Sequence, residues 1–110
     1  MKTIVDINQA NFETEVLKSG QPVVLDFSTP DCGPCKMLVP VLEEIATEMA
    51  GRVKIAKVDA IENQELAVRF RIQAFPTLLY IANGEVRGQT RGAASKKAIV
   101  AKINEILAVK

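Results

Sequence analysis

Hydrophobic and polar positions along the chain follow two repeats, one typical of strands and one typical of helices. Short β-branched or continuously apolar runs predict strands over residues 3–7, 23–28, 52–59, 77–82 and 85–90. Apolar residues at three- and four-residue steps predict helices over residues 11–20, 35–51, 62–70 and 95–107. The order βαβαβα followed by ββα predicts a three-layer α/β domain with a parallel half and an antiparallel hairpin half.

Local signals mark the ends of several of these elements. Asn11 is expected to cap the first helix and Gly20 to end it. Asn83 and Gly84 join two β-rich runs and both tolerate a positive φ, which makes this pair the strongest hairpin signal in the chain. Ser95 is expected to cap the last helix.

Length and composition indicate one ordinary domain over residues 1–110, since 48% of the residues are apolar and 25% are charged. Fourteen Lys and Arg against thirteen Asp and Glu leave a net charge of +1, which argues against nucleic acid or an anionic membrane as partner. A spanning helix needs roughly 18 apolar residues, and no comparable run occurs. Asp6 interrupts the apolar stretch before a signal-peptide core could form, so we expect a cytoplasmic protein.

The two cysteines, Cys32 and Cys35, are separated by Gly33 and Pro34 and lie between a predicted strand and a predicted helix. This spacing lets a disulfide close within the first helical turn. Unsatisfied N–H groups and the helix dipole at that end lower the pKa of Cys32 below the value of about 8.5 for a free thiol, which favours Cys32 as the nucleophile. Pro34 suits a first turn because its missing N–H would be unpaired there anyway.

Two alternatives for the cysteines remain open. One is a disulfide that only stabilises the fold, although closing so short a loop contributes about 2 kcal/mol and a reducing compartment opposes it. The other is half of a zinc site. With two cysteines and no histidine in the chain, a tetrahedral site would need a second copy or added carboxylates.

Several motifs in order resemble the thioredoxin family, over essentially the whole chain. They are Val24–Phe27, Cys32–Lys36, Phe75–Thr77, Gly84 and Gly92. The resemblance implies the thioredoxin fold, a central five-stranded mixed sheet flanked by four helices. It also implies a monomer that reduces protein disulfides through a Cys32–Cys35 dithiol/disulfide couple. An NADPH-dependent flavoprotein reductase would restore the dithiol, and no bound cofactor or metal would be needed.

Asp26 interrupts the apolar run of residues 23–27, where burial would raise the pKa of its carboxyl group. The resemblance implies that Asp26 accepts the proton of Cys35. Lys57 shares strand parity with Val53 and Ile55, so its stem is expected on a buried face. Its ammonium group either reaches solvent or approaches Asp26 and opposes the rise in pKa.

The resemblance further implies a substrate-docking groove beside the disulfide. It places a cis peptide between Phe75 and Pro76, with the backbone of Phe75 pairing with the substrate chain and Gly92 lining the same groove. From the residues alone, Pro76 is equally an ordinary first residue of a strand, and Gly92 an ordinary turn glycine.

The chain departs from the family where Ser28 and Asp31 stand in place of tryptophans, and it has no tryptophan at all. Large aromatic anchors often dominate protein recognition, so the range of partners is expected to be narrower or different. Asp31 either caps the following helix or, as a charge in water near Cys32, raises the pKa of that thiol by roughly a few tenths. The altered flank also motivates an alternative function, a redox-independent thioredoxin-fold binding subunit of a protein complex.

Overall fold

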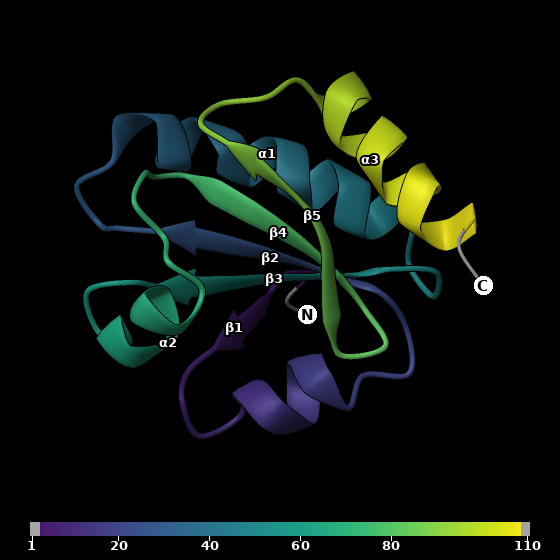
Figure 1. Cartoon of the computed structure of the whole chain (residues 1–110). Coiled ribbons are helices and arrows are strands. Elements are labelled where there is room, and N and C mark those ends of the chain that lie inside the picture. The colour runs from purple at the N-terminus through teal and green to yellow at the C-terminus, as the bar shows by residue number, and fades with distance from the viewer. Residues whose placement is uncertain (1–2, 109–110) are drawn as a thin grey trace.

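The computed structural model describes residues 3–108 and contains a central five-stranded sheet with helices on both faces (Figure 1). The strands are β1 (Val5–Ile7), β2 (Val23–Ser28), β3 (Lys54–Asp59), β4 (Thr77–Ala82) and β5 (Glu85–Arg91). They are ordered β1-β3-β2-β4-β5 across the sheet. β1 and β2 are parallel to β3, whereas β4 is antiparallel to both β2 and β5. The predicted parallel half and hairpin half are therefore confirmed.

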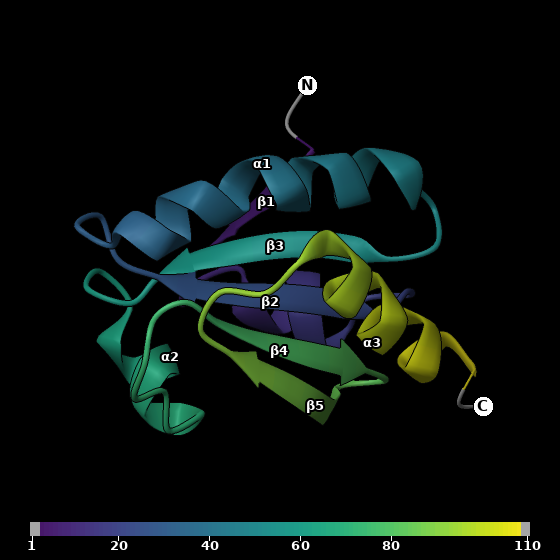
Figure 2. The same cartoon turned by 90° about the horizontal axis from the view of Figure 1, so that it is seen from above.

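The helical segments are η1 (Glu13–Leu17), α1 (Gly33–Glu48), α2 (Gln64–Arg69) and α3 (Lys96–Ala108). α1 and α3 cover one face of the sheet, and η1 and α2 cover the other (Figures 1 and 2). The arrangement confirms the three-layer α/β fold with a mixed sheet and four helical segments. No helix within residues 3–108 is long and apolar enough to cross a membrane.

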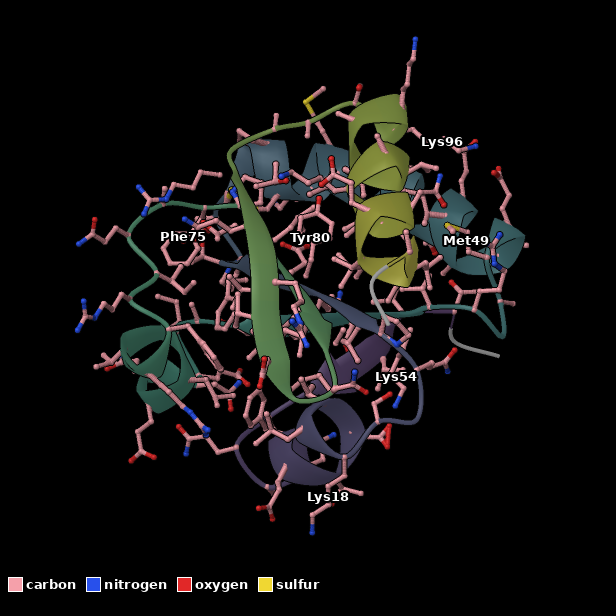
Figure 3. All side chains as sticks on the ribbon, turned by 45° about the vertical axis from the view of Figure 1, so that its right-hand side comes forward. Lys18, Met49, Lys54, Phe75, Tyr80 and Lys96 are labelled. Carbon is pink, nitrogen blue, oxygen red and sulfur yellow. A yellow bond between two sulfur atoms is a disulfide. The ribbon has the colours of Figure 1, made fainter. Side chains whose placement is uncertain are left out.

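The sheet separates two hydrophobic clusters. Under α1 and α3, Leu42, Ile45 and Ile103 are fully buried together with Tyr80. The Tyr80 ring lies between the sheet and these helices (Figure 3), and its hydroxyl is 2.9 Å from the Thr90 hydroxyl. The second cluster, under η1 and α2, consists of buried residues from the strands and both helical segments: Ile7, Phe12, Val16, Val23, Leu25, Phe27, Ala56, Val58, Leu66, Leu79 and Ile81. β2 and β4 contribute to both clusters, which explains their continuous apolar runs.

Two of the predicted local signals appear as expected. The Ser95 hydroxyl accepts the N–H of Ala98 at 3.1 Å and so caps α3. Asn83 and Gly84 connect β4 to β5 with φ values of 54° and 76°, the left-handed conformation that a tight hairpin turn requires.

The expectation for the first helix is wrong in two respects. Asn11 does not cap it, because its side chain accepts the N–H of Asn8 at 2.8 Å and donates to the Asp6 carbonyl at 3.0 Å. The segment is a short π-helix, in which the N–H of Lys18 donates to the Glu13 carbonyl, and it ends at Leu17 rather than near Gly20. Asn11 thus holds the turn after β1 instead of the helix start.

The turn at Gly84 generates a stability prediction. Gly84 has a φ of 76°, and a Cβ there would lie 3.3 Å from the Leu17 carbonyl oxygen. We expect Gly84→Ala to lower the free energy of unfolding by about 1–2 kcal/mol, measured by denaturant titration. Gly20→Ala is the control, because a Cβ at Gly20 meets nothing within 4 Å, and its effect should stay under about 0.5 kcal/mol. Equal effects of the two substitutions would show that the turn does not require glycine at residue 84.

Candidate active site

A disulfide between Cys32 and Cys35 stands where β2 leads into α1, with Cα atoms 5.2 Å apart. Cys32 occupies the N-cap of α1, and its sulfur accepts the N–H of Cys35 at 3.1 Å. Gly33 and Pro34 form the first helical positions, as the sequence predicts. The positive end of the α1 dipole therefore faces the Cys32 sulfur, an arrangement that stabilises a thiolate.

The two sulfur-bearing residues differ in exposure. Cys32 is half-buried, whereas Cys35 is only 3% exposed. The expectation that Asp31 caps α1 is wrong, because Cys32 takes that position and its own sulfur serves as the acceptor. Asp31 is exposed beside the disulfide. It therefore contributes a negative charge to the site and does not cap the helix.

Asp26 lies in the middle of β2 and is 1% exposed. Burial raises the pKa of its carboxyl group from 3.8 to about 7, although the nearby charge of Lys57 lowers it. The Oδ1 atom of Asp26 has no hydrogen-bond partner among the described residues. The carboxyl group is therefore able to gain and lose a proton near neutral pH.

Lys57 is the register partner of two aspartates. It pairs with Asp26 across β2 and β3 and with Asp6 across β1 and β3. Register partners in neighbouring strands point to the same face, so the three side chains share one side of the sheet. Sequence analysis missed Asp6 as a member of this row. The sequence shows that Asp6 is a polar residue in a short strand, but it does not show that β1 pairs with β3.

The peptide bond between Phe75 and Pro76 is cis. The Pro76 carbonyl accepts the N–H of Gly92 at 2.7 Å, and Gly92 has a φ of 80°. Thr77 pairs with Phe27 on one side and with Arg91 on the other. The cis peptide, Gly92 and the segment that leads to Cys32 therefore leave the sheet at the same end (Figures 1 and 2).

A cleft of about 420 Å³ adjoins the disulfide, and sequence analysis gave no sign of it. Ser28, Cys35 and Lys36 line one part of it, and Lys57 and Asp59 line another.

The sulfurs of Cys32 and Cys35 are bonded to each other. Within residues 3–108, no group of three or more Cys, His, Asp or Glu side chains gathers to hold a metal ion.

Comparison with known proteins identifies the family. The family model named Thioredoxin matches residues 3–105. The chain belongs to the thioredoxin family. It is 45% identical to a thioredoxin of Haemophilus influenzae over 96% of this chain and 98% of the relative. It is 43% identical to thioredoxin C-2 of Corynebacterium nephridii over 94% of this chain and 95% of the relative. It is 40% identical to a thioredoxin of Mycobacterium tuberculosis over 94% of this chain and 89% of the relative.

Thioredoxins are thiol-disulfide oxidoreductases, and the family match together with the Cys32–Cys35 disulfide identifies the chain as one of them. Its redox centre is that disulfide, which needs no cofactor because the two sulfurs hold the electrons. Membership implies disulfide-containing proteins as substrates and a thioredoxin reductase as partner. The thioredoxin fold and the reductase activity expected from the sequence are confirmed.

The raised pKa of Asp26 makes stability depend on pH. Between pH 3.8 and about 7 the folded carboxyl keeps a proton that the unfolded chain has lost, so the free energy of unfolding falls as pH rises through this range. In the oxidised Asp26→Asn variant this fall disappears, and from acid to mildly alkaline pH the variant gains roughly 4 kcal/mol over the unaltered chain. Denaturant titrations at several pH values measure the difference.

Two control variants sharpen this test. The exposed carboxylate Glu43 provides Glu43→Gln, whose stability should follow the pH dependence of the unaltered chain. Lys57→Met removes the charge that lowers the pKa of Asp26, so the fall in stability should extend to higher pH. Parallel curves for Asp26→Asn and the unaltered chain would show that Asp26 does not titrate in this way.

Proposed function

We propose that the chain reduces protein disulfides by a two-step exchange in which Cys32 attacks and Cys35 resolves. The observation that carries the proposal is the unequal exposure of the pair, since Cys32 is half-buried and Cys35 is 3% exposed. A protein substrate meets Cys32 first. The Cys32 thiolate bonds to one substrate sulfur, the substrate disulfide breaks, and its second sulfur leaves as a thiolate.

Cys32 is suited to attack by its place at the start of α1. The N–H of Cys35 points at its sulfur, and the remaining first-turn N–H groups add to the positive end of the dipole. These donors stabilise the thiolate over the thiol and so increase the nucleophilic fraction near neutral pH. Gly33 and Pro34 form the turn that keeps the two sulfurs within bonding distance.

Cys35 completes the exchange. Its thiolate attacks Cys32 in the mixed disulfide, the reduced substrate leaves, and the Cys32–Cys35 disulfide forms. Cys35 is buried, so its proton needs a nearby acceptor, and the proposal assigns that role to Asp26. A carboxyl group with a pKa of about 7 is close to ideal for accepting a proton near neutrality. Lys57 modulates Asp26, because its charge lowers the pKa that burial raises.

The proposal places the substrate chain along the cis peptide. Phe75 is half-buried, Pro76 is buried, and the hydrogen bond from Gly92 to the Pro76 carbonyl ties the two loops together. Their position at the disulfide end of the sheet supports pairing between the Phe75 backbone and a substrate segment. Gly92 then lines the same groove.

The remaining parts of the proposal concern partners and location. We assign recharging of the disulfide to an NADPH-dependent flavoprotein of the thioredoxin reductase type, and the working form to a monomer with one domain over residues 1–110. The Gly33–Pro34 pair resembles the reductive branch of the family and supports reduction as the direction. Reduction in turn fits a cytoplasmic, reducing compartment.

Insulin reduction with dithiothreitol as electron donor tests the proposed function. We expect the unaltered chain to accelerate insulin precipitation and the Cys32→Ser, Cys35→Ser double variant to match the uncatalysed rate, because exchange needs both sulfurs.

In a lysate, Cys35→Ser should accumulate mixed disulfides with substrates, and Cys32→Ser should not. If the unaltered chain itself shows no activity above the uncatalysed rate, the redox-independent binding subunit is favoured; trapping by Cys32→Ser alone would reverse the two roles.

Asp31 provides a test of electrostatics at the nucleophile. Its negative charge next to Cys32 disfavours the thiolate, so we expect Asp31→Trp to lower the pKa of Cys32. A pH titration of the ultraviolet thiolate absorbance measures this pKa. Asp31→Asn separates charge from the indole ring, and it should give a similar decrease. If neither substitution changes the titration, the charge of Asp31 does not influence the pKa of Cys32.

A further inference from the structure

Charge is distributed unequally along the chain, although the net charge is only +1. Residues 66–104 contain seven Lys and Arg but a single acidic residue, Glu85, whereas the rest of the chain contains seven Lys and Arg and twelve Asp and Glu. The positive segment forms most of α2, the cis peptide, β4, β5 and most of α3. The docking groove proposed at Phe75 and Pro76 therefore lies in the positive part of the chain.

Arg91 brings one of these positive charges next to the groove. It is the last residue of β5 and precedes Gly92, whose N–H donates to the Pro76 carbonyl at 2.7 Å. This hydrogen bond continues the pairing of β4 with β5 past the ends of both strands. The position of Arg91 is therefore set by the same backbone that holds the cis proline.

The register of the sheet places Arg91 on the same face as Phe75. Arg91 pairs with Thr77, and Thr77 pairs on its other side with Phe27, a member of the hydrophobic cluster under η1 and α2. Register partners point to the same face of a sheet, so Arg91 lies on the η1 and α2 face. Phe75 packs against that cluster, at the end of the sheet opposite the β4–β5 turn (Figure 3). A substrate chain that pairs with the Phe75 backbone therefore passes close to Arg91.

The charge of Arg91 is not neutralised by a neighbour. On the same strand Arg87 forms a salt bridge with Glu85 at 3.4 Å, and on α3 Lys96 pairs with Glu48. Arg91 is exposed, and within residues 3–108 no acidic side chain lies within salt-bridge distance of it. Its guanidinium group is therefore available to a carboxylate on a docked chain.

The opposite flank of the groove has a different charge. β2 and β5 pair with opposite edges of β4, so the segment that leads to Cys32 lies on one side of the cis peptide and Arg91 on the other. Asp31 in that segment is exposed and negative, and Lys36 in the first turn of α1 offsets part of its charge. A carboxylate of a substrate is therefore attracted on the β5 side of the groove and not on the β2 side.

We infer that Arg91 is a specificity-determining residue that favours protein disulfides flanked by acidic side chains. The inference rests on the proposed function, in particular on docking along Phe75, and adds the charge of the preferred substrate. A carboxylate near the attacked cysteine of the substrate approaches the Arg91 guanidinium as the substrate sulfur meets Cys32. A charge pair at the rim of a docking surface acts mainly on the association rate and is sensitive to salt.

Three cyclic peptides test this preference. Each contains one intramolecular disulfide, and they differ only in the residues that flank the ring, which are Glu, Gln or Lys. The reduced chain is mixed with each peptide and quenched with acid, and its remaining thiols are counted by maleimide mass tagging. Division by the rate of the same peptide with 2-mercaptoethanol removes its intrinsic reactivity. At about 0.15 M ionic strength we expect the Glu peptide to react about threefold faster than the Lys peptide, and an equal or inverse order would overturn the inference.

Substitutions on β5 show whether Arg91 sets the preference. Arg91→Gln should lower the Glu/Lys ratio of rates about threefold, and Arg91→Glu about tenfold, because the charge is removed or reversed. Each ratio compares two substrates of one variant, so any change in folding or in the reactivity of Cys32 cancels.

Arg87→Gln is the matched control, because it removes the same charge from the same strand. Four residues along a strand span roughly 13 Å, more than the Debye length of about 8 Å at this ionic strength. The Glu/Lys ratio of Arg87→Gln should therefore stay within about 1.5-fold of that of the unaltered chain. A decrease as large as in Arg91→Gln would show that the overall charge, and not Arg91, selects the substrate.

Salt tests the inference without any substitution. At about 1 M ionic strength the Debye length falls to about 3 Å, so the Glu/Lys ratio of the unaltered chain should approach that of Arg91→Gln. A ratio that salt does not change would contradict electrostatic selection. Failure of the proposed function is distinct, because the unaltered chain would then reduce none of the three peptides. Reduction of all three at equal corrected rates would overturn only the role of Arg91.

Discussion

Burial of β2 on both of its faces and at both of its edges is the constraint on which the active site depends. β3 pairs along one edge, β4 along the other, and helices cover each face. This position removes water from Asp26, which raises the pKa of its carboxyl group. The same rigid strand ends next to Cys32, so the start of α1 is held where one sulfur is accessible and the other is buried.

Much of the fold could be predicted because its strongest signals are local. The apolar run Val23–Ser28 and the Asn83–Gly84 turn agree with the observed β2 and hairpin, since burial and positive φ are encoded by the residues themselves. The cap at Asn11 was mispredicted because its side chain bonds to the end of β1, a choice set by the tertiary fold. The cap of α1 was misplaced by one residue because a cysteine sulfur can also accept the N–H.

The features of the candidate site also differ in whether one segment of the sequence encodes them. The dithiol, Asp26 and the cis proline follow from motifs in the sequence, because each motif is continuous or lies within one strand. The row formed by Asp6, Lys57 and Asp26 requires the register of three strands, and two of the connections between them are long. The cleft requires the relative position of α1 and the end of β3. Neither is encoded in the spacing of any single segment.

If Asp26 has the proposed role, function and stability oppose each other at this position. A carboxyl group in the middle of β2 costs stability once it is ionised, and an apolar residue there would avoid this cost. The charge of Lys57 offsets only part of the cost, because the pKa remains raised to about 7. A stronger partner for Asp26 would stabilise the fold but would also make the carboxylate a weaker base, which would oppose the role proposed for it toward Cys35.

Ser28 and Asp31, which flank the segment leading to the dithiol, determine the surface around the disulfide. On the open face, an exposed Asp31 and the absence of any tryptophan reduce the aromatic surface available for docking a protein, so the proposed backbone pairing beside Pro76 would carry more of the recognition. On the inner side, Ser28 lines a cleft together with Cys35 and Lys36. Residue 28 therefore lies between the end of β2 and the start of α1, where the size of its side chain affects the surface on both sides of the dithiol.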